Sequence, residues 1–189
     1  MGSARAARAA KLDAPETHLV SARLATPSDA ASIARIYNEG IQDRVATFET
    51  RLRSPEDVAA WFDGTHPIVV AERAGSVVGF ADTSAYRPGR ECYAGVAEFN
   101  VYVDRAHRGR GVGREVMAAL VRESEAAGLW KLLSRVFTDN AASRGLLRSM
   151  GFSEVGVYRC HARLDGAWRD VVIVERLLGD AADNSPGSA

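Results

Sequence analysis

The sequence predicts an α/β domain in which a mixed sheet of about seven strands carries helices on both faces. Two observations lead to this prediction. Short stretches rich in apolar and β-branched residues recur along the chain, and stretches with helical periodicity and capping residues lie between them. The elements follow the order β-α-α-β-β-β-α-β-α-β-β, and 189 residues suit one such domain with tails.

The first half of the chain opens with a strand and two capped helices. Residues 21–25 alternate as a short strand, and residues 26–29, Thr-Pro-Ser-Asp, favour a helix start. A similar start, Ser-Pro-Glu-Asp, predicts a second helix over residues 54–64. Residues 67–86 predict two strands around an Ala-Gly turn, and residues 95–104 predict another strand.

The second half alternates helices and strands and closes with a hairpin. Apolar residues recur every four positions from residue 112, which predicts a helix that ends at the glycine of position 128. Residues 131–137 predict a buried strand, and residues 140–151 a helix with a polar cap and a glycine stop. Residues 152–164 and 168–178 predict two strands joined at an Asp-Gly turn.

Composition excludes several classes of protein. Twenty-four basic and 24 acidic residues give no net charge, which argues against nucleic acid as the main partner. No apolar run approaches the roughly 18 residues of a membrane span, so no membrane association is expected. Cys92 and Cys160 have no metal-ligand spacing, so we expect no metal and reduced thiols in a cytoplasmic protein. We expect a flexible tail at 1–19, a folded domain at 20–178 and a disordered tail at 179–189.

One segment, residues 107–114, concentrates three glycines and four basic side chains as His-Arg-Gly-Arg-Gly-Val-Gly-Arg. It lies between a predicted strand and a predicted helix, where backbone amides bind anions. Glycines let the backbone approach phosphate oxygens closely. The segment lacks the Gly-Lys-Ser/Thr ending of a P-loop and the G-x-G-x-x-G of a dinucleotide fold. A solvated glycine-arginine turn is the alternative.

The pattern Arg108-x-x-Gly111-x-Gly113 resembles the pyrophosphate-binding loop of the GNAT acetyltransferase family. The preceding strand, the following helix and the later segment "NAASRGLLRSMGF" support this resemblance, which spans the whole folded region. It implies the GNAT fold and acetyl-CoA as cosubstrate. The residues that it implies for acetyl-CoA binding are Val101, Tyr102, Val103, Arg108, Gly109, Arg110, Gly111, Val112, Gly113, Arg114, Asn140 and Ser143.

Three further segments resemble the phosphinothricin acetyltransferase group, which includes methionine sulfoximine and arsinothricin N-acetyltransferases. These segments are "VATFETR", "YRPGRECYAGVAEFNVYV" and "GAWRDVVIVERL", and their sequences are most similar to those of arsinothricin N-acetyltransferases. The resemblance implies acetyl transfer to the α-amino group of a small glutamate-like amino acid, detoxification as the outcome, and a homodimer.

Glu98 is the candidate catalytic base. The substrate ammonium must lose a proton before its nitrogen attacks a thioester, and a carboxylate in the cleft can accept that proton. Glu98 interrupts an apolar strand ten residues before Arg108 of the glycine-rich segment. Its side chain points to the opposite face of the strand from those of Ala97 and Phe99. It also matches the glutamate base of the resembling group. A solvated edge-strand glutamate is the alternative. A backbone amide of the same strand is the natural donor to the oxyanion, and the resemblance implies the segment Val101–Val103 for this role.

The proton donor to the leaving thiolate departs from the pattern of the resembling families. Relatives carry a tyrosine or histidine four residues before the glycine of "MGF", whereas this chain has Leu147, which cannot donate a proton. Tyr158 is our candidate donor, with Tyr102 or solvent as alternatives.

Candidate substrate-binding residues come from three segments. Arginine suits planar recognition of carboxylates and related anions, and Arg87 and Arg90 precede the catalytic strand with Tyr93 beside them. Phe48 and His161 resemble residues that border the amino-acid pocket in relatives. The alternatives are solvated arginines and core packing.

Two other functions stay open. The chain could acetylate a peptide N-terminus or an aminoglycoside, although the arginine-rich loop argues against a polycationic substrate. It could also be a binding module that senses acetyl-CoA without catalysis, with Leu147 as a sign of lost activity.

Overall fold

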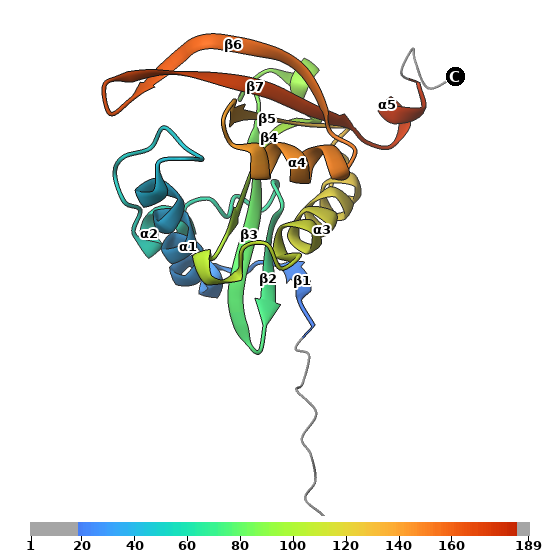
Figure 1. Cartoon of the computed structure of the whole chain (residues 1–189). Helices are drawn as coiled ribbons and strands as arrows, with labels where there is room; N and C mark the ends of the chain where they lie inside the picture. Colours follow the sequence, from blue (N-terminus) through green and yellow to red (C-terminus); the bar gives the residue numbers. More distant parts are fainter. Residues whose placement is uncertain (1–18, 185–189) are drawn as a thin grey trace, which may run out of the picture.

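The computed structural model describes residues 19–184 and contains a seven-stranded mixed sheet in the order β1-β2-β3-β4-β5-β7-β6 (Figure 1). Only β4 and β5 run parallel; the other neighbours are antiparallel. This architecture confirms the predicted fold class. The strands are β1 (Ser21–Leu24), β2 (Ile68–Arg73), β3 (Ser76–Ala85), β4 (Val96–Val103), β5 (Lys131–Phe137), β6 (Ser153–Leu164) and β7 (Ala167–Leu177).

Helices cover both faces of the sheet, as Figure 1 shows. The main helices are α1 (Ala30–Asp43), α2 (Pro55–Ala59), α3 (Val112–Ala126) and α4 (Ala141–Ser149). On one face Ile33 and Ile36 of α1 pack with Phe80 and Tyr102. The helices α3 and α4 and the opposite sheet face share a second core, whose members include Met117, Leu120, Leu147, Phe99 and Leu132.

The second helix is shorter than predicted. Its start is as expected, because Ser54 accepts a hydrogen bond from the N–H of Asp57 and Asp57 accepts one from the N–H of Ser54. The helix nevertheless ends at Ala59 instead of continuing to residue 64. Trp61 turns into the α1 side of the core, where its ring meets Tyr37 edge-on at 5.5 Å. Tertiary packing therefore overrides the helical pattern here.

The tight turns form where the sequence predicts them. Ala74 and Gly75 both have positive φ, at 51° and 73°, and so do Asp165 and Gly166, at 48° and 81°. Such pairs match the twist of the strands that they connect.

The strands β4 and β5 pair over only three residues. Val96–Glu98 lie beside Lys131–Leu133, and beyond these positions β4 stays with β3 while β5 stays with β7. At the two ends of β4, the N–H of Asp104 donates to the carbonyl of Val78 on the β3 side, and the carbonyl of Gly95 accepts the N–H of Trp130 on the β5 side. Because peptide groups alternate along a strand, Val101 and Val103 direct theirs to the side where β5 has separated. This opening is the place where the sheet can receive a ligand.

The closing hairpin contains an irregularity that bears on the site. The register between β6 and β7 shifts between Tyr158 and Ala162, and Cys160 takes a positive φ of 47°. The carboxylate of Asp170 accepts the N–H of Cys160 at 2.7 Å and holds this bulge. A bulge redirects the side chains that follow it, here that of His161.

The chain ends lie mostly outside the described residues. The prediction of a flexible segment at 1–19 falls almost wholly there, as does the part of the C-terminal prediction at 185–189. Within the segment predicted to be disordered, Asp180–Asp183 form one helical turn, α5, after Leu178 has entered the core. Residues 19–184 contain no helix with both the length and the apolar character needed to cross a bilayer.

Candidate active site

The glycine-rich loop places a set of free backbone amides at the start of α3. After the 3-10 turn η3 (Arg105–His107), Gly109 and Gly111 take positive φ values of 70° and 86°. Gly111 is the N-cap of α3 and has no side-chain capping bond. Within the described part of the chain, no backbone acceptor bonds the N–H groups of residues 109–113. These donors, together with the positive end of the helix, are suited to bind an anion.

The three arginines of the loop differ in their surroundings. The guanidinium of Arg108 donates to the carbonyl of Val103 at 3.1 Å and to Asp43 at 2.6 Å, so it fastens the loop to β4 and α1. Arg114 donates to the hydroxyl of Ser149 at 3.1 Å and thereby links α3 to α4. Arg110 is exposed. The side chain of Val112 is buried in the core, so that this residue can offer a ligand only its backbone.

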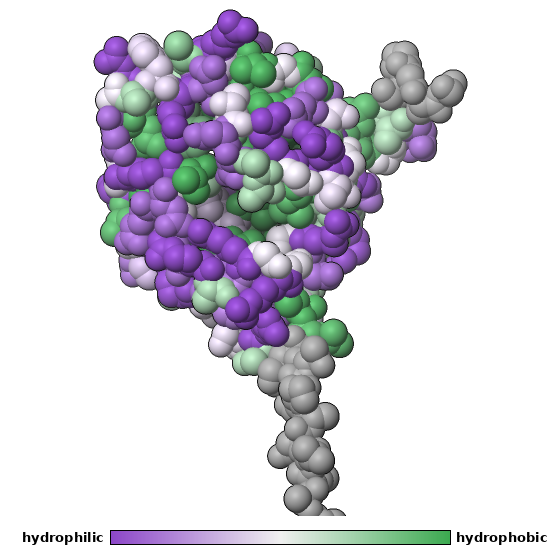
Figure 2. All heavy atoms as spheres, viewed as in Figure 1, coloured by the Kyte–Doolittle hydropathy of each residue, from purple (hydrophilic) through white to green (hydrophobic). Residues whose placement is uncertain are grey.

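A cleft of about 550 Å³ joins this loop to β4 and α4. Figure 2 shows this face of the molecule, where hydrophilic rims surround a central hollow with apolar atoms at its bottom. The side chain of Asn140 caps α4 by accepting the N–H of Ser143 at 3.0 Å, and it donates to the carbonyl of Val45 at 3.0 Å. The predicted cofactor residues in the cleft wall are Val101, Tyr102, Val103, Arg108, Gly109, Gly111, Gly113, Arg114, Asn140 and Ser143. Free amides at one end and apolar walls at the other fit a long ligand with a phosphate group and a less polar arm.

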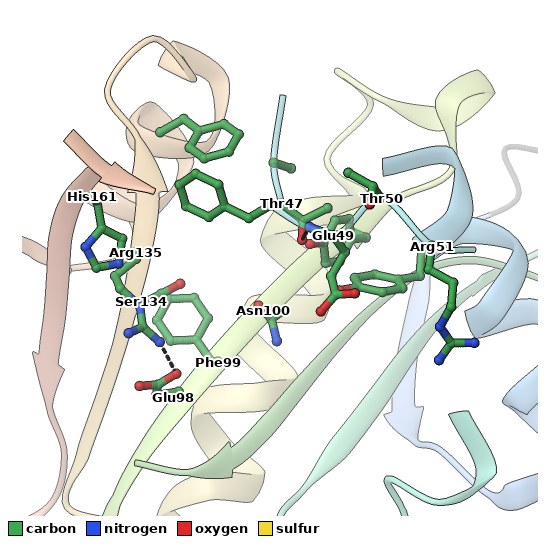
Figure 3. Close-up of a pocket in the computed structure, with 15 residues that line it drawn as sticks. Thr47, Glu49, Thr50, Arg51, Glu98, Phe99, Asn100, Ser134, Arg135 and His161 are labelled. Atoms are coloured by element: carbon green, nitrogen blue, oxygen red, sulfur yellow. Dashed lines mark hydrogen bonds and ion pairs between the residues drawn. The ribbon is translucent and has the colours of Figure 1, made fainter. Parts of the chain in front are cut away.

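A second cavity, of about 450 Å³, lies on the α1 side of the opening and is drawn in Figure 3. Strands β4 and β5 and the segment after α1 form its walls, and His161 reaches it from the bulge of β6. Phe48 packs edge-on against Phe137 at 4.8 Å and closes one side. The polar residues of the wall are Thr47, Glu49, Thr50, Arg51, Glu98, Asn100, Ser134, Arg135 and His161.

This second cavity contains charges of both signs, and most of them are paired. Glu98 of β4 receives a hydrogen bond from Arg135 of β5, and the two side chains face each other in Figure 3. Glu49 pairs with Arg53 at 2.7 Å. Arg51 pairs with Asp57 at 2.9 Å. A zwitterionic ligand with an ammonium and an anion finds partners for both charges here.

Asn100 lies in the cavity wall above a buried carboxyl group. Its amide nitrogen donates to Asp82 of β3 at 3.0 Å, and Asp82 is only 8% exposed. Burial raises the pKa of Asp82 from 3.8 to about 6, and the bond from Asn100 opposes this rise. This bond orients the Asn100 amide, with its nitrogen toward Asp82 and its oxygen on the opposite side.

A narrow passage of about 70 Å³ connects the two spaces through the opening between β4 and β5. It shares Asn100 and Arg135 with the cavity, and Val101 and Ser143 with the cleft. A ligand in the cleft and a second ligand in the cavity can therefore meet at this passage, whose wall includes Arg135, the partner of Glu98. Among residues 19–184 no group of three or more His, Cys, Asp and Glu side chains is arranged to hold a metal ion.

The structure brings together some of the predicted substrate and catalytic residues. Glu98, Phe48 and His161 all line the cavity. The predicted alternation in β4 also holds, because Phe99 enters one core and Tyr102 the other.

Other predicted residues lie elsewhere. Arg87 and Arg90 are exposed on the loop between β3 and β4, where the guanidinium of Arg87 lies 5.3 Å and 5.6 Å from the ring centres of Tyr86 and Tyr93. None of Arg87, Arg90 and Tyr93 lines the cavity. Tyr158 is half exposed and does not line it either; its ring stacks on His161 at 5.2 Å.

Sequence reasoning missed most of the polar wall. Arg135 follows the same rule that identified Glu98, since it is a charge within the apolar strand "KLLSRVF". Glu49 and Arg51 belong to the quoted segment "VATFETR", yet no role was expected for them. The pair Asp82 and Asn100 becomes visible only when the register of β3 and β4 is known.

Comparisons with known proteins agree with this geometry. Residues 33–152 match the model of the Acetyltransferase (GNAT) family. The L-methionine sulfoximine/L-methionine sulfone acetyltransferase of Pseudomonas aeruginosa is 34% identical over 166 residues, which are 84% of this chain and 94% of that protein.

Two crystal structures share the fold and about 30% of the sequence. The phosphinothricin acetyltransferase of Sinorhizobium meliloti, solved in complex with acetyl-CoA, has a TM-score of 0.80 at 29% identity over 90% of this chain and 94% of that one. The ribosomal-protein-alanine N-acetyltransferase of Brucella melitensis has a TM-score of 0.78 at 32% identity over 83% of this chain and 99% of that one. With the family model covering the loop, the opening and α4, the chain belongs to the GNAT family of acetyltransferases.

Proposed function

We propose that this protein transfers the acetyl group of acetyl-CoA to the α-amino group of a small glutamate-like amino acid such as phosphinothricin, arsinothricin or methionine sulfoximine. One observation carries the proposal: the opening between β4 and β5 joins the glycine-loop cleft to a cavity that contains Glu98 and charges of both signs. The names of the Pseudomonas and Sinorhizobium relatives support the substrate class.

In this proposal the glycine loop holds the pyrophosphate of acetyl-CoA through the amides of residues 109–113, with Arg110 and Arg114 nearby. The acyl arm extends along the open side of β4, where Val101 and Val103 offer their peptide groups. The acetyl group then reaches the passage, next to the cavity that Glu98 lines.

The chemistry needs one base and one oxyanion donor. Glu98 takes a proton from the substrate ammonium, and the neutral nitrogen attacks the thioester carbonyl. A backbone N–H of Val101–Val103 stabilises the oxyanion. Attack forms the C–N bond and gives a tetrahedral intermediate, which loses the second proton of its nitrogen to solvent. Collapse of this intermediate restores the carbonyl, breaks the C–S bond and releases the thiolate, which takes up one proton. The net products are the acetamide, the CoA thiol and one proton.

The leaving thiolate receives its proton from solvent in this scheme. Leu147 is buried in the core at 1% exposure and offers no proton. Tyr158 stacks on His161 and does not border the passage. Tyr102 does line the passage, and burial raises its pKa well above the ordinary value, so its hydroxyl stays protonated and is the alternative donor.

A peptide N-terminus is the second candidate substrate, favoured by the likeness to the Brucella ribosomal-protein-alanine N-acetyltransferase. It differs from an amino acid in having no free carboxylate next to the reacting amine.

We further propose that acetylation inactivates a toxic amino acid, and that the protein acts as a homodimer.

The test is a thiol-release assay with acetyl-CoA and a panel of amines: phosphinothricin, arsinothricin, methionine sulfoximine, glutamate and an alanine-initiated peptide. We expect release with at least one of the amino acids, and a product whose mass has risen by one acetyl group. Release with the peptide alone would favour the second candidate. No release above the rate of acetyl-CoA hydrolysis with any amine would contradict the proposal.

A further inference from the structure

The ion pair between Glu98 and Arg135 places a cation against the carboxylate that the proposed reaction uses as its base. Glu98 is at the last paired position of β4, opposite Leu133, and Arg135 follows two residues later on the separating part of β5. Residues two apart on a strand share a face, so Arg135 lies on the same side as Glu98 and reaches across the opening. Both side chains line the cavity, and Arg135 also lines the passage.

Arg135 is also the cavity cation with the most donors to spare. Within residues 19–184 it donates only from Nη2, to Oε2 of Glu98, which leaves Nε and Nη1 without a partner. Arg51, by comparison, uses both terminal nitrogens on Asp57, at 2.9 Å and 3.3 Å. The side chain of Arg135 is 41% exposed, so a ligand in the cavity can reach it.

The resting pair opposes deprotonation of a simple amine. An ammonium that approaches Glu98 meets the positive charge of Arg135, and like charges at this range repel more strongly near a protein surface than in bulk water. It must also compete for a carboxylate oxygen that already accepts a charged hydrogen bond. An amine without an anion brings nothing to offset either effect.

We propose that the substrate's own anion removes this obstacle by an exchange of partners. The anionic group binds Arg135, the ammonium takes its place at Glu98, and two ion pairs replace one. Glu98 is then free to accept the proton of the ammonium, and the reaction proceeds as described above. Arg135 would thus make acetyl transfer depend on an anion in the substrate. This inference rests on the proposed function and adds to it the residue that selects acidic amino acids.

The experiment compares wild type, Arg135→Gln, Arg135→Lys and Arg122→Gln with four amines: phosphinothricin, glutamate, glutamine and glutamine amide. The first two carry two anionic groups, glutamine carries only the α-carboxylate, and glutamine amide carries none. Arg122 is the matched control, since it is an exposed arginine paired with Glu123 on α3, away from the cavity.

The expected result is that Arg135→Gln changes the rates in opposite directions for anionic amines and for an amine without an anion. Arg135→Gln should lower kcat/KM for phosphinothricin and glutamate by roughly 10- to 100-fold, because a charged hydrogen-bond partner of the anion is lost. It should raise kcat for glutamine amide, because Glu98 is no longer paired. Arg135→Lys should retain part of the preference for anions, and Arg122→Gln should change nothing. A loss with glutamine as well would assign the α-carboxylate to Arg135; no loss with glutamine would assign the side-chain anion.

Calorimetric binding of the four amines and thermal unfolding of each variant complete the experiment. Equal changes of all four rates in Arg135→Gln would overturn the exchange and leave the proposed function intact, as would unchanged binding of phosphinothricin. If wild type neither binds nor acetylates any of the four, the proposed function fails and the exchange fails with it.

Discussion

At the scale of single residues, Asp82 has the most unusual environment in the site. It is a carboxyl group on a central strand, below the cavity, with one hydrogen bond, from Asn100. An ionised carboxylate only accepts hydrogen bonds, so it holds the nitrogen of Asn100 toward itself and the oxygen of Asn100 on the opposite side. Asp82 thereby decides whether the cavity meets an acceptor or a donor at this position.

Asp82 should make stability depend on pH. Its folded pKa of about 6 lies above the unfolded value near 3.8, so the folded state binds the proton more tightly and ionisation opposes folding. The free energy of unfolding should therefore fall as pH rises from about 4 to about 6. Asp82→Asn should be the more stable protein at pH 8, by up to about 3 kcal/mol, and this advantage should nearly vanish at pH 4. Urea denaturation across this range measures it; a difference that stays constant with pH would disprove the assignment.

Residue roles could be predicted from the sequence only in part. Glu98 stands out because a carboxylate in an apolar strand is costly unless it has a partner or a use. Arg135 carries the same signal, but its significance depends on lying beside Glu98, which requires the pairing of strand residues 35 positions apart in the chain. Arg87 and Arg90 were expected at the cavity because they precede β4, yet the loop directs them to solvent.

At the scale of elements, the start of α3 combines a backbone requirement with a binding role. Gly111 has a φ of 86°, which side chains with a Cβ adopt only with strain, and no heavy atom lies within 4 Å of a Cβ added there. The cost of a substitution at this position therefore comes from the backbone and not from a clash.

Gly111→Ala should weaken acetyl-CoA binding. Strain of about 1 kcal/mol, or a small shift of the loop that relieves it, should raise the KM for acetyl-CoA roughly fivefold or more. The matched control is Gly128→Ala, after the far end of α3, where φ is 78° and an added Cβ is equally unobstructed. It should lower stability to a similar degree and leave this KM unchanged. Equal KM values in the two variants would show that the loop does not bind acetyl-CoA.

Element types and turns could be predicted well because caps, glycines and periodicity are local signals. The end of α2 could not, since the packing of Trp61 against Tyr37 overrides the pattern that continues the helix. The bulge in β6 could not either, because it depends on a contact between Cys160 and Asp170 across the hairpin.

At the scale of the whole molecule, one edge of the sheet exposes more apolar surface than the other. Nine consecutive residues of the edge strand β6, from Ser153 to His161, are exposed. Val155, Val157 and Tyr158 are about half exposed, as is Trp168 on β7. An uncovered edge strand of this length is a template for pairing with another chain.

The proposed homodimer should therefore use β6. Sedimentation velocity should show a particle of twice the 20.3 kDa chain mass for wild type. Val157→Asp should dissociate it, since a carboxylate would be buried at the contact. Leu24→Asp changes a comparably exposed side chain on β1, the opposite edge, and should leave the dimer intact. A monomeric wild type, or a dimer lost only in Leu24→Asp, would refute this interface.

The central claim is that Glu98, at the point where β4 and β5 separate, is the base of acetyl transfer to an amine. Steady-state kinetics of Glu98→Gln test it most directly, with the preferred amine saturating and acetyl-CoA varied. The account predicts that kcat falls by roughly 10²- to 10⁴-fold while the KM for acetyl-CoA stays within about twofold of wild type. A Glu98→Gln protein that turns over at the wild-type rate would contradict it.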